Sequence, residues 1–202
     1  KFFFLSAPLV GVAATALAAT ILWRAALFGA EGFTGDVIVL IYLLTIPALA
    51  VVLGAFASRN PLASIGGSRE MKLVLGYELP FILAVLVPIV QSNGIQLAGF
   101  LANPAVGSLS GVLALAVALV CMQAKLTLVP FDLPEAETEL AGGAFIEYSG
   151  PPLGMYMLTR AMMLFTMPVF LVTVFCGGLD LSLGIGPALL GILKYVGLVV
   201  VV

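Results

Sequence analysis

The sequence predicts an all-α, polytopic bundle of about six transmembrane helices, with a structured acidic loop on the cytoplasmic side. The prediction rests on three observations: 62% of the 202 residues are apolar, only 9% are charged, and the mean hydropathy is +1.25. Soluble chains are roughly 45–50% apolar and about 25% charged. A chain of this composition therefore requires lipid around it.

Six apolar stretches meet, or nearly meet, the requirement of about 20 residues for a helix that crosses the hydrocarbon core. They lie at residues 2–23, 37–57, 71–90, 109–129, 152–176 and 185–202. We interpret residues 1–202 as a single membrane domain. Because the chain begins at Lys1 and is still apolar where it stops, we expect it to be the middle of a longer protein.

Positive charges in the short connections predict how the bundle lies in a cell membrane, because cytoplasmic loops carry an excess of Lys and Arg. With six crossings, residues 58–70 and 130–151 share one face with the N-terminus. One cation, Arg24, lies in the opposite connections. Five lie on or near the first face: Lys1, Arg59, Arg69, Lys72 and Lys125. The loops at 58–70 and 130–151 are therefore predicted to be cytoplasmic.

The residue types that usually carry catalysis are scarce. The chain has no His, and its two cysteines, Cys121 and Cys176, lie inside apolar runs. This argues against a His general base, a His/Cys zinc site, or thiolate-bound haem or iron–sulfur clusters. A net charge of −2 gives no basic patch for nucleic acid. We expect no catalytic residue, metal site or cofactor in this chain, and any electron transfer on a partner.

Half of the acidic residues fall in one short segment, PFDLPEAETELAGGAFIEYSGPP. They are Asp132, Glu135, Glu137, Glu139 and Glu147. A plain solvated loop is the simplest reading, but apolar residues are interleaved with the acids and glycine and proline pairs mark turns. We expect the segment to fold against protein, which brings carboxylates together so that they share protons. Arg59 and Arg69, in the other predicted cytoplasmic loop, are candidate partners for it.

Glu78, in GYELPFILAVLVP, lies about two turns into the third predicted span. An acid at helix centre costs about 2.5–3.5 kcal/mol on insertion scales, so such residues usually face protein or water and mark an ion path. Pro80 leaves the Gly76 carbonyl without its helical partner beside this carboxyl. The alternative is a Glu that is satisfied by a neighbouring helix and has no transport role.

Arg160 and Lys194 also lie within predicted spans. Each either extends its charge to the membrane interface or provides a counter-charge that keeps an acid ionised. No nucleotide-binding motif and no Ser/His/Asp set accompanies them.

Three motifs resemble one known family: PFDLPEAETELAGGAFIEYSG (Pro130–Gly150), GYELP around Glu78, and SRNPLASIGGSRE. They resemble the subunit 1 family of complex I, also called the H subunit, over most of the chain. In quinone-reducing members, the residues before PFDL typically read Glu-Thr-Asn-Arg-Ala, whereas this chain has Lys125-Leu126-Thr127-Leu128-Val129. EAETEL, a Gly pair and EYSGPPL are more similar to the membrane subunit of energy-converting, group 4 nickel–iron hydrogenases and related ferredoxin-linked complexes.

The resemblance implies a non-catalytic subunit that links electron transfer in a docked hydrophilic arm to proton or sodium translocation. It implies a nickel–iron hydrogenase-like large subunit, iron–sulfur cluster subunits and antiporter-like membrane subunits as partners. The iron–sulfur clusters and nickel–iron centre lie on those partners. Glu78, Glu137 and Glu147 resemble the family's line of glutamates, with Arg160 and Lys194 as candidate counter-charges. The residues that would shape the docking loop are Arg59, Arg69, Asp132, Glu135, Glu139 and Tyr148.

Three other functions fit part of the pattern. The first is the quinone-site subunit of an NADH–quinone oxidoreductase. The second is a secondary transporter in which Glu78 and Arg160 bind a coupling ion and substrate. The third is a plain membrane anchor, which leaves the clustered acids and Glu78 without a role.

Overall fold

The computed structural model describes residues 2–28, 33, 35–135, 142–179 and 185–201. Helices make up most of the described part, which contains no strand. The bounds of the elements are α1 Phe2–Phe28, α2 Asp36–Ala57, α3 Pro61–Ser92, α4 Leu97–Ala102, η1 Ala105–Gly107, α5 Leu109–Lys125, η2 Gly143–Phe145, α7 Pro151–Phe175 and α8 Ile185–Val201. The predicted all-α polytopic bundle is therefore confirmed.

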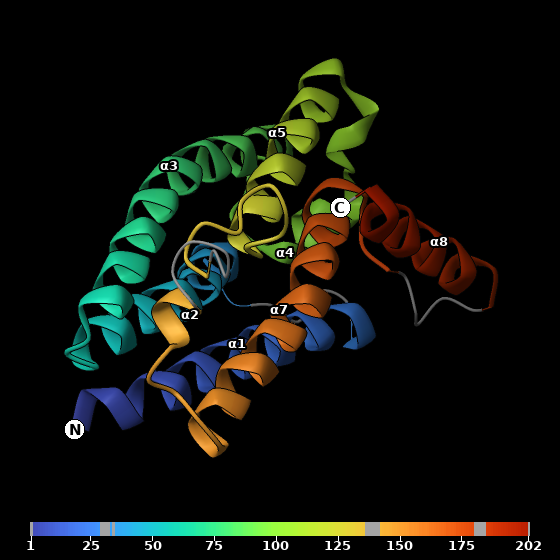
Figure 1. Cartoon of the computed structure of the whole chain (residues 1–202). Coiled ribbons are helices and arrows are strands. Elements are labelled where there is room, and N and C mark those ends of the chain that lie inside the picture. The colour runs from blue at the N-terminus through green and yellow to red at the C-terminus, as the bar shows by residue number, and fades with distance from the viewer. Residues whose placement is uncertain (1, 29–32, 34, 136–141, 180–184, 202) are drawn as a thin grey trace.

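Four helices, α1, α2, α3 and α7, are long and apolar enough to cross a membrane, whereas α5 and α8 are shorter apolar helices of 17 residues each. Helix α1 packs on α2 and α7, α2 packs on α3, α3 packs on α5, and α8 packs on α7. Figure 1 shows α1, α2 and α7 side by side, with α3 arching over them toward α5. The arch follows from Pro80 and Pro88, which interrupt the hydrogen-bond ladder inside α3.

The stretch at 58–70, predicted as a loop, is mostly helix, which corrects the sequence interpretation. Asn60 caps α3, because its side chain accepts a hydrogen bond from the Leu62 N–H at 2.9 Å, and Pro61 fills the first helical position. The two glycines in this stretch belong to a buried helix face. A Cβ on Gly66 would lie 2.5 Å from the Ala144 backbone nitrogen and 2.8 Å from the Pro134 carbonyl. The glycine thus allows two described parts of the acidic loop (residues 130–151), at Pro134 and at Ala144, to lie directly on α3.

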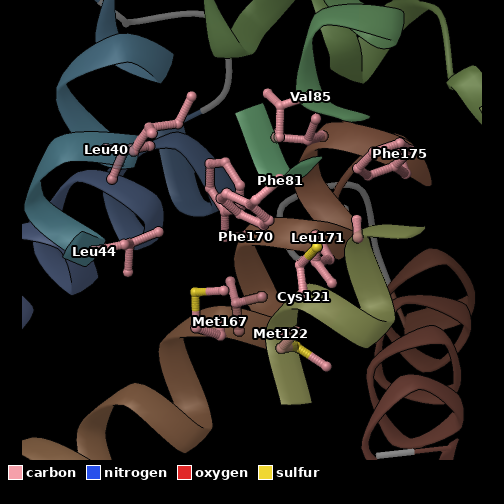
Figure 2. Packing of buried hydrophobic residues seen from close by; sticks show 14 of the residues in the cluster. Leu40, Leu44, Phe81, Val85, Cys121, Met122, Met167, Phe170, Leu171 and Phe175 are labelled. Carbon is pink, nitrogen blue, oxygen red and sulfur yellow. The ribbon is translucent and has the colours of Figure 1, made fainter. Parts of the chain in front are cut away.

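The core is formed where α2, α3, α5 and α7 meet. Phe81 and Val85 of α3 pack toward Phe170 and Leu171 of α7, with Met122 of α5 beside them (Figure 2). These five side chains are all fully buried. This packing fixes α3 relative to α5. It thereby positions Glu78, one turn before Phe81, and Lys125, one turn after Met122.

The outer surface of the bundle is apolar. On α3 alone, Leu75, Leu79, Leu83 and Val90 expose between 55% and 71% of their surface. Their spacing of four, four and seven residues forms a stripe along one side of the helix. Such a stripe suits contact with acyl chains or with another membrane helix, in agreement with the predicted lipid environment.

Candidate functional site

Glu78 on α3 is held by side chains from two neighbouring helices. Lys125, at the end of α5, donates from Nζ to Glu78 Oε2 at 2.8 Å, and the Thr45 hydroxyl of α2 donates to Glu78 Oε1 at 2.6 Å. The Lys125 side chain has no exposed surface, and that of Glu78 is 18% exposed. Removing one partner of a buried pair leaves a charge without compensation. The two residues therefore depend on each other.

Aromatic rings complete the surroundings of the Lys125 ammonium group. Its Nζ lies 4.8 Å from the centroid of the Phe81 ring and 5.4 Å from that of Tyr77. Both distances are within the range of a cation–π interaction. Nζ also lies 3.2 Å from Thr45 Oγ1. The ammonium group is thus stabilised by one carboxylate, one hydroxyl and two ring faces.

A second ion pair ties the acidic loop to the bundle. Arg160 of α7 donates from Nη1 to Glu135 Oε1 at 2.6 Å and from Nη2 to Thr127 Oγ1 at 2.7 Å. One guanidinium therefore joins α7, the acidic loop and the residues that follow α5. Arg160 was expected to provide a counter-charge for an acidic residue, and in the structure that acidic residue is Glu135.

A cavity of about 70 Å³ lies between these two ion pairs. Its charged lining consists of Glu70, Lys125, Glu135 and Arg160, and most of the remaining wall is apolar. A water molecule needs roughly 10–15 Å³ of such space and two to four polar partners. The cavity thus has the size and polar groups to hold several waters within the apolar bundle.

Two predicted residues at the other end of the acidic loop, Glu147 of the ion pathway and Tyr148 of the docking loop, contact neighbouring elements of the bundle. Glu147 is exposed and accepts a hydrogen bond from Asn60 Nδ2 at 2.6 Å. Tyr148 is buried, donates to the Phe4 carbonyl at 2.9 Å and stacks on the Phe4 ring. Burial raises the pKa of the Tyr148 hydroxyl. These contacts fix the loop on α1 and on the turn before α3.

Other predicted residues lie apart from this site or outside the described part. Glu137 and Glu139 fall outside the described residues. Lys194 is exposed and donates from Nζ to the Cys176 carbonyl at 2.8 Å, at the end of α7. The structure therefore does not bring Lys194 to the Glu78 cluster.

The remaining docking candidates lie on or beside α3 and the acidic loop. Arg59 adopts a left-handed backbone conformation, φ 61°, in the turn between α2 and α3. Arg69 lines a second, largely apolar cavity between α3 and α5, together with Lys72. Asp132 is half-buried, and its Oδ1 has no hydrogen-bond partner among the described residues.

Glu147 also lies away from the Glu78 cluster. Its hydrogen-bond partner Asn60 is separated from Glu78 by about 27 Å of helix. Its place in an ion pathway stays a prediction.

Three site residues were missed by the sequence interpretation: Glu70, Lys125 and Thr45. Lys125 was counted as a cation of the cytoplasmic face, although it lies at the end of a 17-residue apolar helix. The rule that singled out Glu78, an ionisable residue inside an apolar run, applies equally to Lys125. Glu70 was assigned to a loop and is 2% exposed inside α3. Among the described residues, no cluster of His, Cys, Asp or Glu is arranged to hold a metal ion.

Comparison with known proteins gives consistent matches. A family model described as NADH dehydrogenase matches residues 1–202. The H subunit of the NADH-quinone oxidoreductase of Thermomicrobium roseum is 32% identical over 198 residues, which cover 88% of this chain and 58% of the relative. Its counterpart in Brevibacillus brevis is 34% identical over 135 residues, 66% of this chain and 40% of the relative. This chain thus spans about 40–58% of the length of these relatives.

A solved structure has the same fold. A chain of the membrane-bound sulfane sulfur reductase, an archaeal respiratory membrane complex, superposes with a TM-score of 0.86 at 25% identity. The match covers 100% of this chain and 68% of the other.

Proposed function

Because this chain belongs to the NADH dehydrogenase family, we propose that it couples electron transfer in docked partner subunits to ion translocation across a membrane. Its expected setting is a complex I-like respiratory assembly in the cell membrane, with residues 130–151 on the cytoplasmic side. The observation that carries the proposal is the Glu78–Lys125 pair, two opposite charges held by hydrogen bonds within an apolar bundle. A plain anchor has no use for such a pair, and its burial is costly.

The arrangement suggests how a charge change at the docking face reaches the membrane interior. Redox chemistry on a partner beside the acidic loop alters the local charge. Glu135 and Arg160 respond first, because Glu135 belongs to that loop and Arg160 is its ion-pair partner. Lys125, which lines the same cavity, then changes its contact with the Glu78 carboxylate. Protons or sodium ions move in antiporter-like neighbouring subunits.

We place the chain in the ferredoxin-linked, energy-converting hydrogenase branch. Lys125 supports this placement, since it stands where quinone-reducing members typically have Glu and it forms an ion pair with the carboxylate of GYELP. The likeness to a sulfane sulfur reductase supports a branch other than the quinone-reducing one. The expected partners are a nickel–iron large subunit and iron–sulfur subunits, which carry the redox centres. A secondary transporter is disfavoured by the family match.

Glu78→Gln in the assembled complex tests the proposal. In sealed vesicles supplied with reductant, this variant should keep electron transfer when the membrane is made leaky and lose ion accumulation when it is sealed. Asp36→Asn is a matched control, because Asp36 is another buried carboxyl, at the start of α2 and away from the cavity. Full pumping by Glu78→Gln at the wild-type redox rate would reject the proposal.

A second candidate is a quinone-site subunit, favoured by the identity of 32–34% with the H subunits of two NADH-quinone oxidoreductases. Addition of a soluble quinone to the purified complex separates the two candidates. Reductant-dependent quinone reduction that stops with a quinone-site inhibitor would support the second. Turnover with ferredoxin that is indifferent to the inhibitor would support the first.

A further inference from the structure

A groove on the outside of the bundle, between α3 and α5, has no part in the proposed function. Its volume of about 780 Å³ falls within the roughly 300–1,000 Å³ that is usual for sites of small organic ligands. It opens outward, because Gly76 of α3 and Val117 and Val120 of α5, which line it, are exposed. It shares no lining residue with the cavity between the two ion pairs. The groove is therefore a separate candidate for a binding site.

The groove has the form of a long slot, because one face of each helix lines it. The lining residues of α3 recur every three or four positions, in one stripe along the helix: Arg69, Lys72, Leu73, Gly76, Tyr77 and Pro80. From Arg69 to Pro80 the stripe is about 16 Å long. A Cβ placed on Gly76 would have no atom within 4 Å, so the slot is wide at its centre. A slot of this length along a membrane helix suits an extended hydrocarbon chain.

The charges of the groove lie at one end of it. Arg69 and Lys72 are one helical turn apart, and no acidic side chain is among the lining residues that the structure describes. Residues 73–90 of α3, whose single charge is Glu78, span about 27 Å, close to the roughly 30 Å of a hydrocarbon core. Arg69 and Lys72 therefore lie at the level of the lipid headgroups, on the predicted cytoplasmic side. Cations at that level attract anionic lipids.

Tyr77 adds a hydrogen-bond donor deeper in the groove. Its side chain lines the groove and is 4% exposed, and its hydroxyl has no hydrogen-bond partner among the described residues. A buried hydroxyl without a partner is costly, so an acceptor is expected beside it. Tyr77 follows Lys72 by five residues, about 7.5 Å along α3. A glycerophospholipid has oxygen acceptors at that depth, because its glycerol linkages lie directly below the phosphate.

We propose that the groove between α3 and α5 binds one anionic phospholipid. The phosphate lies between Arg69 and Lys72. An oxygen of the glycerol linkage accepts a hydrogen bond from the Tyr77 hydroxyl, and one hydrocarbon chain follows the slot past Gly76 to Pro80. A membrane helix of a partner subunit suits the groove less well, because its backbone groups are bonded within the helix and its apolar side chains provide no acceptor for Tyr77.

Photo-crosslinking in the assembled complex tests the charge recognition. The complex is placed in phosphatidylcholine vesicles with a minor amount of phosphatidylglycerol that carries a photoactivatable group in its acyl chain, and mass spectrometry locates the attachment sites. We expect attachment to groove residues of α3 and α5, suppressed by unlabelled phosphatidylglycerol. Lys72→Gln should reduce it about fivefold, and Lys72→Arg should retain it. Lys194→Gln, which removes an exposed cation of α8 outside the groove, should have no effect.

A second variant tests the slot itself. Gly76→Leu fills the centre of the groove, and because Leu is a better helix former than Gly, α3 should not lose stability. We expect loss of lipid attachment in the groove with no decrease in the thermal unfolding temperature of the complex. Gly154→Leu is the matched control, because Gly154 also has open space around it but lies on α7, outside the groove. It should leave the attachment unchanged.

Four results would overturn the proposal. Equal attachment of phosphatidylcholine and phosphatidylglycerol probes, or attachment that Lys72→Gln does not reduce, would show only the lipid that surrounds any membrane protein. Attachment that persists in Gly76→Leu would place the lipid elsewhere. No attachment to the groove of the wild-type complex would show that another occupant, such as a helix of a partner subunit, fills it.

Discussion

Substitution of the two partners of the buried ion pair should give unequal losses of stability. Glu78→Met leaves the Lys125 ammonium, which has no exposed surface, without its carboxylate. We expect this variant to lose about 3–5 kcal/mol, as is typical when one partner of a buried pair is removed. Lys125→Met leaves a Glu78 side chain that is 18% exposed and keeps the Thr45 hydroxyl at 2.6 Å. That variant should lose less, about 1.5–3 kcal/mol.

The double variant should restore most of the stability. Two methionines replace the ion pair with apolar groups of similar length, a change that is often close to neutral in other proteins. We expect Glu78→Met with Lys125→Met to lie within about 1 kcal/mol of the wild type, which makes the two substitutions strongly non-additive.

Cys121, one turn before Lys125 in α5, reports this stability inside the intact complex. The thiol is buried, so a maleimide reacts only after local opening, and mass spectrometry measures labelling of this subunit alone. A loss of about 3 kcal/mol corresponds to labelling more than about a hundredfold faster. Additive effects in the double variant, or a larger loss for Lys125→Met than for Glu78→Met, would refute the reasoning.

Three further predictions concern the acidic loop. Gly66→Val should detach the loop from α3 and cost at least about 1–3 kcal/mol, because the new side chain meets backbone atoms of the loop; protease sensitivity of the loop measures this, and Gly76→Ala, with open space around it, should have no effect. Arg160→Lys should reduce pumping less than Arg160→Met but not restore it, because Lys cannot reach Glu135 and Thr127 together; vesicle assays compare the two. Tyr148→Phe should destabilise the subunit by about 0.5–1.5 kcal/mol in a thermal unfolding measurement, since it loses the hydroxyl with its bond to the Phe4 carbonyl and its contact with the Tyr156 hydroxyl, and keeps the ring stacking.

The sequence was sufficient for the class of fold and for most helix positions, because long apolar runs have few alternatives to membrane helices. It misplaced the start of α3. Ser, Asn, Pro and Gly at 58–67 are typical of a loop, yet Gly66 and Gly67 lie on a buried helix face whose partner, the acidic loop, is remote in sequence. Local propensity contains no information about such a contact.

The site was half predictable for a similar reason. Glu78 and Arg160 stood out as charges within apolar runs, but their partners depend on how helices cross, which spacing along one chain does not reveal. Lys125 comes from α5 and Glu135 from the acidic loop. The cavity between them exists only in the packed bundle. Glu70 was missed because residues 58–70 were assigned to a loop, where an exposed acidic residue is ordinary and does not indicate a site.

The continuity of α3 has a mechanical consequence. One hydrogen-bonded rod runs from the surface that carries Asn60, past the glycine face beneath the acidic loop, to Glu78 and the break at Pro80. A displacement of the acidic loop therefore reaches Glu78 through a continuous helix, without a flexible turn in between. The part of α3 before Pro80 then moves as one unit, and its movement changes the contact between Glu78 and the Lys125 ammonium.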